Sequence, residues 1–226
     1  MSSGGNGLRG KFVVLEGIDG CGKSTQAVLL ADALGALRTF EPGDTSTGKH
    51  IRSIVLAAPR ETGNDGSELD SRAEALLMLS DRAQHVAEVI EPALLSGRWV
   101  VCDRFAGSTL AYQGSGRGLD IELLAAMSSW ATKGLNADLN ILVNVSTEVA
   151  KARRLSAGSW SADSPSTGDR IEVQPDSFQD AVAAGFAMQA EREPDRWAIV
   201  DGSASVQDVA SQVLKCVTER LGLPSV

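Results

Sequence analysis

Nine residues near the N-terminus have the order of a phosphate-binding loop. Residues 17–25 read GIDGCGKST, which fits the pattern G-x-x-x-x-G-K-[ST]. Glycines let the backbone N–H groups turn inward toward a phosphate, Lys23 reaches the phosphate oxygens, and the Ser24 hydroxyl can ligate Mg²⁺. We therefore predict that the phosphates of a nucleotide contact this loop, whose residues are Gly17, Ile18, Asp19, Gly20, Cys21, Gly22, Lys23, Ser24 and Thr25.

Two charged residues follow another apolar run further along the chain. Asp103 and Arg104 directly follow residues 99–102, WVVC, which have the composition of a buried strand. The carboxyl ends of parallel strands form the edge at which ligands bind in such folds. A guanidinium at this edge can neutralise a second phosphate.

The elements that must position these residues alternate along the chain. Strand patterns cover residues 11–16, 38–41, 99–102, 139–145 and 197–200, and helical patterns cover residues 23–35, 51–55, 71–96, 119–133, 147–155, 177–192 and 205–221. The phosphate-loop motif follows the first strand and opens the first helix, as the motif requires. The pattern predicts an α/β fold of the P-loop NTPase type, with three layers and a five-stranded parallel sheet covered by helices on both faces.

Domain organisation is predicted to be simple. Residues 1–10 are rich in Ser and Gly and are expected to form a flexible tail, and residues 11–226 are expected to form a single domain. A Ser/Gly/Pro-rich stretch at residues 156–168 suggests a small lid, placed at about residues 153–170. Four basic and two acidic side chains give residues 151–170 a local charge of +2: Lys151, Arg153, Arg154, Arg170, Asp163 and Asp169.

The overall composition excludes several classes of protein. The 226 residues include 21 Lys+Arg and 29 Asp+Glu, a net charge of −8, which argues against a nucleic-acid partner. The chain has no apolar stretch long enough for a transmembrane helix and no apolar segment of a signal peptide near its start. Three widely spaced cysteines and two histidines form no disulfide or zinc pattern. We expect a cytoplasmic protein that does not bind membranes.

Several motifs in order resemble the bacterial thymidylate kinase (dTMP kinase) family of P-loop nucleoside-monophosphate kinases. They are residues 12–26 (FVVLEGIDGCGKSTQ), 41–43 (EPG), 77–82 (LMLSDR), 103–105 (DRF), 108–118 (STLAYQGSGRG) and 169–172 (DRIE). The resemblance implies Mg²⁺-dependent transfer of the γ-phosphoryl of ATP to dTMP, giving dTDP for dTTP biosynthesis. It also implies a homodimer formed through long helices.

The resemblance implies roles for individual residues of this chain. Arg104 would grip the dTMP phosphate, Asp103 would lie beside Mg²⁺, and Arg82 would reach the thymine. Asp19 corresponds to a carboxylate near the deoxyribose 3′-hydroxyl. Tyr112 would pack under the deoxyribose, where it disfavours a 2′-hydroxyl, and the residues expected to line the base pocket are Met78, Ser108, Thr109 and Gln113.

A catalytic arginine is implied in the lid. Some members of the family carry this arginine within the phosphate loop, but this chain has Gly20 at that position. The resemblance therefore implies the other kind of family member, in which the catalytic arginine lies in the lid. Arg153, Arg154 or Arg170 would then bridge the phosphates. The acceptor phosphate has a second pKa of about 6 and is largely ionised at pH 7, so no general base is required.

Three positions depart from the family pattern. Phe40 stands where an arginine is common, which leaves Arg38 or Arg52 as substitutes, and Met78 stands where an aromatic ring usually stacks on thymine. Asp44 begins a DTS segment in place of the usual GGT and adds a negative charge near the site.

These departures leave two alternatives open. One is a P-loop kinase with a different nucleotide or nucleoside as acceptor. The other is a nucleotide-binding protein without catalytic activity.

Overall fold

The computed structural model describes residues 9–57, 69–156 and 169–224. Five strands form one sheet in its centre: β1 (Phe12–Glu16), β2 (Leu37–Phe40), β3 (Val100–Asp103), β4 (Leu139–Asn144) and β5 (Trp197–Asp201). The strand order is β2-β3-β1-β4-β5, and every neighbouring pair is parallel. This topology confirms the predicted α/β class with a five-stranded parallel sheet.

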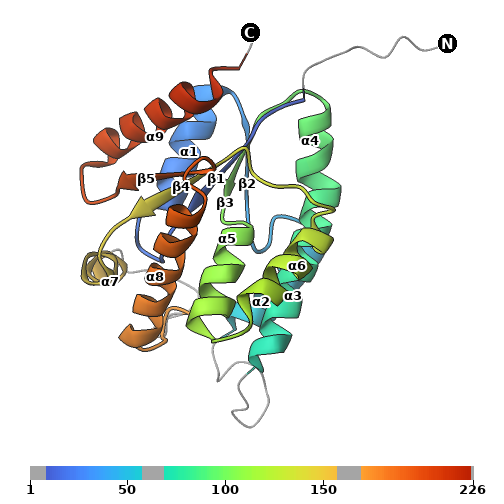
Figure 1. The fold of residues 1–226 in the computed structure, drawn as a ribbon, viewed down its shortest axis with the longest axis vertical. Coiled ribbons are helices and arrows are strands. Elements are labelled where there is room, and N and C mark those ends of the chain that lie inside the picture. Colours follow the sequence, from blue (N-terminus) through green and yellow to red (C-terminus); the bar gives the residue numbers. More distant parts are fainter. Residues whose placement is uncertain (1–8, 58–68, 157–168, 225–226) are drawn as a thin grey trace, which may run out of the picture.

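Helices cover both faces of the sheet because successive side chains of a strand point to opposite sides. Val13 and Leu15 of β1 pack in one cluster with α1 (Lys23–Leu34) and α9 (Val206–Leu221). Phe12 and Val14 pack in a second cluster with the helical segment around Ile90. In Figure 1, α1 and α9 lie together on the left of the sheet, and α3, α4 and α6 lie on the right.

The long helix predicted over residues 71–96 is present but is not a uniform α-helix. It comprises α3 (Ser71–His85), a π-helical segment η1 (Val86–Ile90) and α4 (Glu91–Leu95). The N–H of Glu91 donates to the carbonyl of Val86, five residues back, as in a π-helix, and Pro92 then follows in the first turn of α4, where its missing N–H is tolerated.

The remaining helices are α2 (Ser46–Leu56), α5 (Ala106–Thr109), η2 (Leu110–Gly116), α6 (Ile121–Ala131), α7 (Thr147–Ser156) and α8 (Asp176–Arg192). The pair α5 and η2 was not predicted, because the segment is rich in small and polar residues and has no clear apolar period. None of the described helices is long and apolar enough to cross a bilayer.

The carboxyl ends of the strands gather the predicted site residues at one edge. The phosphate loop follows β1, Glu41 follows β2, and Arg104 follows β3. The pairing of Leu15 with Asp103 places the ends of β1 and β3 side by side. Most of the predicted lid and most of the tail lie outside the described residues.

Candidate active site

The phosphate loop has the backbone conformation that its glycines permit. Gly17, Gly20 and Gly22 have φ values of 145°, 87° and 98°, in a region that other residues rarely adopt. Gly22 leads directly into α1, so the positive end of this helix faces the loop. Lys23 is buried, and its Nζ lies 3.5 Å from the carbonyl oxygen of Ile18 and 3.5 Å from Oδ1 of Asp19.

The other loop residues divide into packing and exposed positions. Ile18 and Cys21 are buried in the core cluster that contains α1, so they anchor the loop. Ser24 and Thr25 are exposed in the first turn of α1. A ligand can therefore reach both hydroxyls.

Two predicted lid arginines contact the phosphate loop. Arg153 donates from Nη1 to the carbonyl of Cys21 at 3.3 Å, and Arg154 donates to the carbonyl of Asp19. A Cβ atom at Gly20 would lie only 2.4 Å from the carbonyl oxygen of Ala150 in α7. Gly20 thus allows the helix that carries both arginines to pack against the loop.

Arg104 connects the phosphate loop to the neighbouring pocket. Its φ of 71° is unusual for a residue with a side chain. Its Nη1 donates to the carbonyl of Gly17 and to Oγ of Ser108, both at 3.1 Å. Its Nη2 lies 2.5 Å from Oδ1 of Asp19 and 3.1 Å from the hydroxyl of Tyr112. One guanidinium therefore touches the loop, Asp19 and the first helical turns after β3.

Asp19 is held as a carboxylate by its neighbours. Burial favours the neutral acid, but the charges of Arg104 and Lys23 outweigh it and hold the pKa of Asp19 well below its usual range. The Tyr112 hydroxyl also donates to Oδ2 of Asp19 at 2.7 Å. Burial raises the pKa of Tyr112 well above its usual value, so its hydroxyl stays protonated and can donate.

Asp103 and Ser24 fit a Mg²⁺ ion that is completed by phosphates. Oδ1 of Asp103 is buried and has no hydrogen-bond partner among the described residues. No cluster of three or more His, Cys, Asp or Glu side chains suited to a metal occurs in the described part of the chain. A carboxylate oxygen and a hydroxyl are hard oxygen donors of the kind that suits Mg²⁺, which keeps several waters and substrate phosphates as further ligands.

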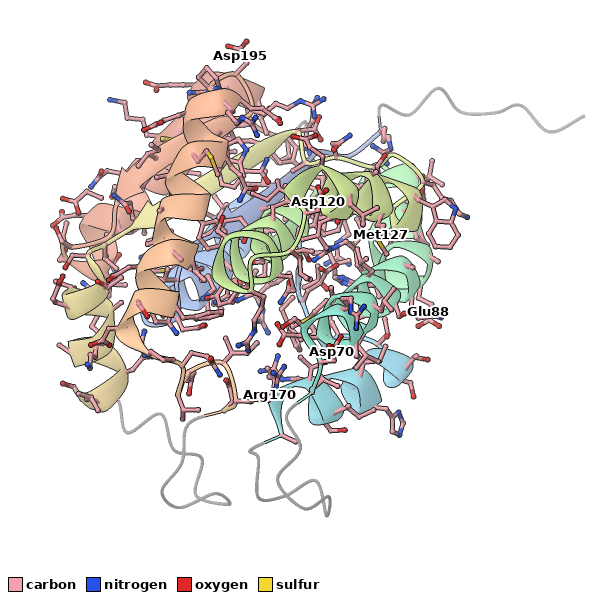
Figure 2. The ribbon with its side chains drawn as sticks, turned by 60° about the horizontal axis from the view of Figure 1, so that its bottom comes forward. Asp70, Glu88, Asp120, Met127, Arg170 and Asp195 are labelled. Atoms are coloured by element: carbon pink, nitrogen blue, oxygen red, sulfur yellow. The ribbon has the colours of Figure 1, made fainter. Side chains whose placement is uncertain are left out.

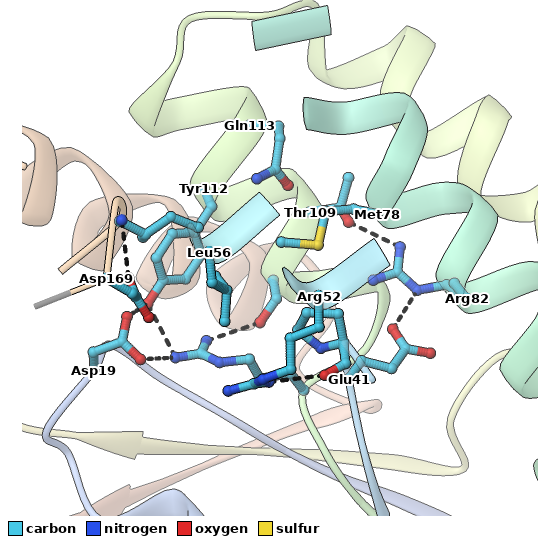
Figure 3. Close-up of a pocket in the computed structure, with 14 residues that line it drawn as sticks. Asp19, Glu41, Arg52, Leu56, Met78, Arg82, Thr109, Tyr112, Gln113 and Asp169 are labelled. Atoms are coloured by element: carbon cyan, nitrogen blue, oxygen red, sulfur yellow. Dashed lines mark hydrogen bonds and ion pairs between the residues drawn. The ribbon is translucent and has the colours of Figure 1, made fainter. Parts of the chain in front are cut away.

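A pocket open to solvent lies beside Arg104 (Figure 3). In Figure 3, Tyr112 of η2 lies on one side of it and Arg82 of α3 on the other, with Met78 of α3 and Thr109 of α5 next to each other between them. Its complete lining is Asp19, Glu41, Pro42, Arg52, Leu56, Met78, Arg82, Arg104, Ser108, Thr109, Tyr112, Gln113, Asp169 and Ile171. The mixture of apolar and polar walls suits a nucleotide.

Arg82 is fixed in this wall by three hydrogen bonds. Its Nε donates to Oε2 of Glu41 at 2.9 Å, Nη1 donates to Oγ1 of Thr109 at 2.8 Å, and Nη2 donates to the carbonyl of Phe105 at 2.8 Å. The guanidinium also lies 5.2 Å from the centre of the Phe105 ring. Arg82 is therefore a rigid donor group in the pocket wall.

Known proteins match this chain over nearly its full length. A family model described as thymidylate kinase matches residues 15–213. The chain is 42% identical to a thymidylate kinase of Synechococcus sp. (strain RCC307), over 96% of this chain and 99% of that protein. The chain belongs to the thymidylate kinase family. It is a phosphotransferase of that family, as the motifs predicted.

Two further relatives agree with this assignment to the thymidylate kinase family. A thymidylate kinase of Desulfovibrio desulfuricans is 44% identical over 91% of this chain and 92% of its own length. The crystal structure of thymidylate kinase from Ehrlichia chaffeensis superposes with a TM-score of 0.72 at 26% identity, covering 93% of this chain and 99% of that one. The fold and the family are thus established by independent comparisons.

The departure from the thymidylate kinase pattern at Phe40 is accompanied by an arginine from another element. Arg52 of α2 lines the pocket and donates to the carbonyl of Pro42 at 2.8 Å. Its guanidinium lies 6.0 Å from the centre of the Phe40 ring. Arg38, the other substitute considered from sequence, is exposed on β2. Arg52 therefore brings a positive charge to the pocket, and Phe40 packs beside it.

Arg170 has partners other than the phosphate loop. Its Nη2 lies 2.5 Å from Oε2 of the fully buried Glu74, and its Nε donates to the carbonyl of Val55 at 3.0 Å. Figure 2 shows Arg170 near the start of α3, the helix that Asp70 caps. The structure therefore separates Arg170 from the phosphate-loop contacts that Arg153 and Arg154 make.

Glu16 was not selected from sequence, although it organises the site. This last residue of β1 accepts hydrogen bonds from the N–H groups of Phe105 and Ser108, at 3.0 and 3.1 Å, and from the Ser108 hydroxyl at 2.6 Å. Complete burial raises the pKa of Glu16 to about 7. The signal in the sequence was a carboxylate at the end of an otherwise apolar strand.

Proposed function

We propose that this chain transfers the γ-phosphoryl group of ATP to dTMP, with the ATP phosphates on the 17–25 loop and dTMP in the pocket beside it. The observation that carries the proposal is the position of Arg104, which contacts both the loop, at Gly17, and the pocket wall, at Ser108 and Tyr112. The phosphates of two nucleotides must meet for transfer. A guanidinium at their meeting point neutralises the repulsion between them and holds them in line.

Positive groups, and no general base, supply the chemistry. The ionised oxygen of dTMP attacks the γ-phosphorus, so no proton has to be removed from it at pH 7. Lys23 binds the phosphates of ATP, and Arg104 holds the acceptor phosphate. Charge develops on the transferring group and on the leaving oxygen, where fixed cations stabilise it.

Ser24 and Asp103 would hold Mg²⁺. The unpartnered Oδ1 of Asp103 and the exposed Ser24 hydroxyl support this assignment. When bound, the ion supplies charge neutralisation between the phosphates.

The lid is proposed to span about residues 153–170, with Arg153 and Arg154 as its catalytic arginines. Both already contact carbonyl groups of the phosphate loop, so small side-chain movements bring them to ATP phosphates. Arg170, which the resemblance also implied, is held by Glu74 and Val55 and is assigned a structural role.

Selection of the base and sugar is assigned to the pocket walls. Arg82 and Thr109 present hydrogen-bonding groups to the base, and Gln113 adds an amide whose Nε2 is engaged by Glu74 at 2.7 Å. Met78 packs on the base face in place of an aromatic ring. Tyr112 and Asp19 stand where the deoxyribose would lie, so a 2′-hydroxyl would be disfavoured.

A homodimer is proposed through the α3–η1–α4 and α6 surface. Leu95 is 68% exposed and Trp130 is 84% exposed, which is costly for large apolar side chains. Leu95 and Ala131, which follows Trp130 in the chain, belong to a groove lined mainly by apolar residues: Ala83, Val86, Ala87, Pro92, Leu95 and Ala131. Light scattering of the wild type and of Trp130→Glu tests this, with a dimer expected for the first and a monomer for the second.

A coupled assay of ADP release tests the main proposal. Purified protein with ATP and Mg²⁺ is offered dTMP, dUMP, dCMP, dGMP and UMP in parallel. A clear preference for dTMP supports the proposal, and preference for another acceptor transfers the assignment to that nucleotide. If none of the acceptors is phosphorylated, the kinase proposal fails and the chain is a nucleotide-binding protein without catalytic activity. The cytoplasmic location remains a prediction, which cell fractionation tests.

A further inference from the structure

A continuous line of polar side chains leads from the half-buried Asp44 to the buried Arg82. Oγ1 of Thr39 donates to Oδ2 of Asp44, and the same oxygen lies 2.5 Å from Nε2 of His85. Nδ1 of His85 lies 3.0 Å from Oε1 of Glu41. The other oxygen of Glu41 accepts from Nε of Arg82 at 2.9 Å. We call these five residues the Asp44–Arg82 chain.

The Asp44–Arg82 chain crosses three parts of the fold. Thr39 belongs to β2, Glu41 and Asp44 follow that strand, and His85 and Arg82 lie on α3. His85 is fully buried. Thr39 and Arg82 are almost as inaccessible, at 1% and 2% exposure. Because solvent does not reach Thr39, His85 or Arg82, these three side chains need protein partners.

The hydrogen-bond partners of the His85 ring bear on its charge. An ionised carboxylate only accepts, so Nδ1 must donate to Glu41. The Thr39 hydroxyl has a single hydrogen, which Asp44 receives, so the Thr39 oxygen can only accept from Nε2. In this arrangement both ring nitrogens of His85 face acceptor oxygens, as the two N–H groups of an imidazolium cation would.

The charges around the ring agree with this state. The charged groups that face His85 or its partners are Glu41 and Asp44 after β2, and Asp81 and Arg82 on its own helix. From β3, the Cys102 thiol has a pKa well above its usual value, chiefly because of burial, and is neutral. With a neutral ring, Arg82 would be the one cation among these groups beside the buried Glu41 and the half-buried Asp44, and unbalanced buried charge is costly.

Asp81 adds a smaller contribution to this balance. It accepts from the N–H of Gly43 at 3.1 Å, and burial together with the nearby charge of Glu41 raises its pKa to about 6. Near pH 7 it is therefore largely a third carboxylate in this region. A cation at His85 lowers the repulsion among the three.

We propose that Asp44, through Thr39, holds His85 as a buried imidazolium, and that this cation positions Glu41 and thereby Arg82 for the base of the acceptor nucleotide. Asp44, Thr39 and His85 act through other residues, so they are positioning residues. The role of Arg82 toward the base rests on the proposed function, but the charge of His85 does not. The proposal also gives a physical role to Asp44, the negative charge that departs from the family pattern.

The charge of His85 can be observed directly by NMR. The chain has two histidines, and the other, His50, is exposed on α2. Protein labelled with ¹⁵N in histidine is compared with His50→Gln, which assigns the remaining ring signals to His85. At pH 7.5 we expect two protonated ring nitrogens. A deprotonated Nε2 or Nδ1 in the wild type would overturn the assigned charge.

Substitutions of Asp44 and Thr39 test the cause of that charge. Asp44→Gly removes the acceptor, so Thr39 can donate to Nε2, and the ring is expected to lose its Nε2 proton at pH 7.5. Thr39→Val removes the acceptor of the Nε2 proton, so in this variant too the ring is expected to lose that proton at pH 7.5. Thr39→Ser keeps the hydroxyl and is the matched control, with both protons retained. An unchanged ring in Asp44→Gly would contradict the role of Asp44.

Kinetics separate the positioning role from a purely structural one. Asp44→Gly is expected to raise the KM for dTMP about tenfold and to leave the KM for ATP nearly unchanged, because a neutral His85 no longer supports the charged hydrogen bond between Glu41 and Arg82. Thr39→Ser should keep both values. A changed ring charge with an unchanged KM for dTMP would refute positioning. Arg82→Lys tests the proposed function separately: if it leaves the KM for dTMP unchanged, the base assignment fails while the NMR result still stands.

Discussion

Nη2 of Arg104 lies 2.5 Å from Oδ1 of Asp19, and this ion pair joins the loop after β3 to the phosphate loop after β1. The two residues are 85 positions apart in the sequence. Their contact places the arginine between the two proposed nucleotide positions. It also keeps Asp19 ionised, so that the arginine is held in place before either substrate binds.

Arg104→Ala is expected to raise the KM for dTMP far more than the KM for ATP. The variant lacks the guanidinium assigned to the acceptor phosphate, so the KM for dTMP should rise at least about tenfold. The KM for ATP should change much less, because Lys23 and the loop backbone remain. Steady-state kinetics with each substrate varied in turn measure both. Equal increases would contradict the assignment of Arg104 to the acceptor.

Arg154→Met and Arg170→Met should have opposite consequences. Arg154 contacts the phosphate loop, so its removal is expected to lower kcat by about 10²-fold with little change in the Tm. Arg170 is buried with Glu74, which also pairs with Arg117. Its removal leaves the buried Glu74 carboxylate with only Arg117 among these two partners and should lower the free energy of unfolding by about 3 kcal/mol. Thermal unfolding and turnover measured on both variants distinguish the roles. A stable but inactive Arg170→Met would restore Arg170 to the catalytic set.

Glu16 is expected to make stability depend on pH. Burial raises its pKa in the folded state from 4.5 to about 7, so between these pH values the folded state retains a proton that the unfolded state has lost. The free energy of unfolding contributed by this group therefore falls as pH rises through that range and is lowest above pH 7.

Glu16→Gln isolates this contribution. The glutamine oxygen can accept from both N–H groups, and its amide can donate to the Ser108 hydroxyl, so the contacts are preserved. The decline in Tm between pH 5 and pH 8 should shrink by roughly 5 °C relative to the wild type. Parallel pH dependence in the two proteins would show that Glu16 does not titrate in this range.

Met78→Phe should strengthen dTMP binding. Met78 lies in the pocket wall where an aromatic ring is usual, and a planar ring offers stacking that a flexible thioether lacks. We expect the KM for dTMP to fall about threefold, with Met78→Leu as a control of similar volume that brings no gain. A rise in KM would mean that the pocket is too narrow at this point for a ring.

The phosphate loop and the strand ends that carry the chemistry were readable from the sequence because each depends on local signals. Gly17, Gly20 and Gly22 supply positive φ values, and the apolar runs before Glu16 and Asp103 are long enough to define buried strands. Several predicted helix boundaries also lie close to the observed ones, since apolar periodicity indicates which face of a helix is buried. The π-helical segments were not predicted, because they change the hydrogen-bond pattern without changing the composition.

The partners of the buried charges were decided only by tertiary structure. Arg153, Arg154 and Arg170 looked equivalent in sequence, yet the fold brings the first two to the phosphate loop and the third to Glu74. Sequence by itself determined which residue types were available and which strand ends they followed. Packing of β2 against α3 decided that Asp44, Thr39, His85 and Glu41 meet, because hydrogen bonds between distant residues depend on how the elements pack and leave no period in the chain.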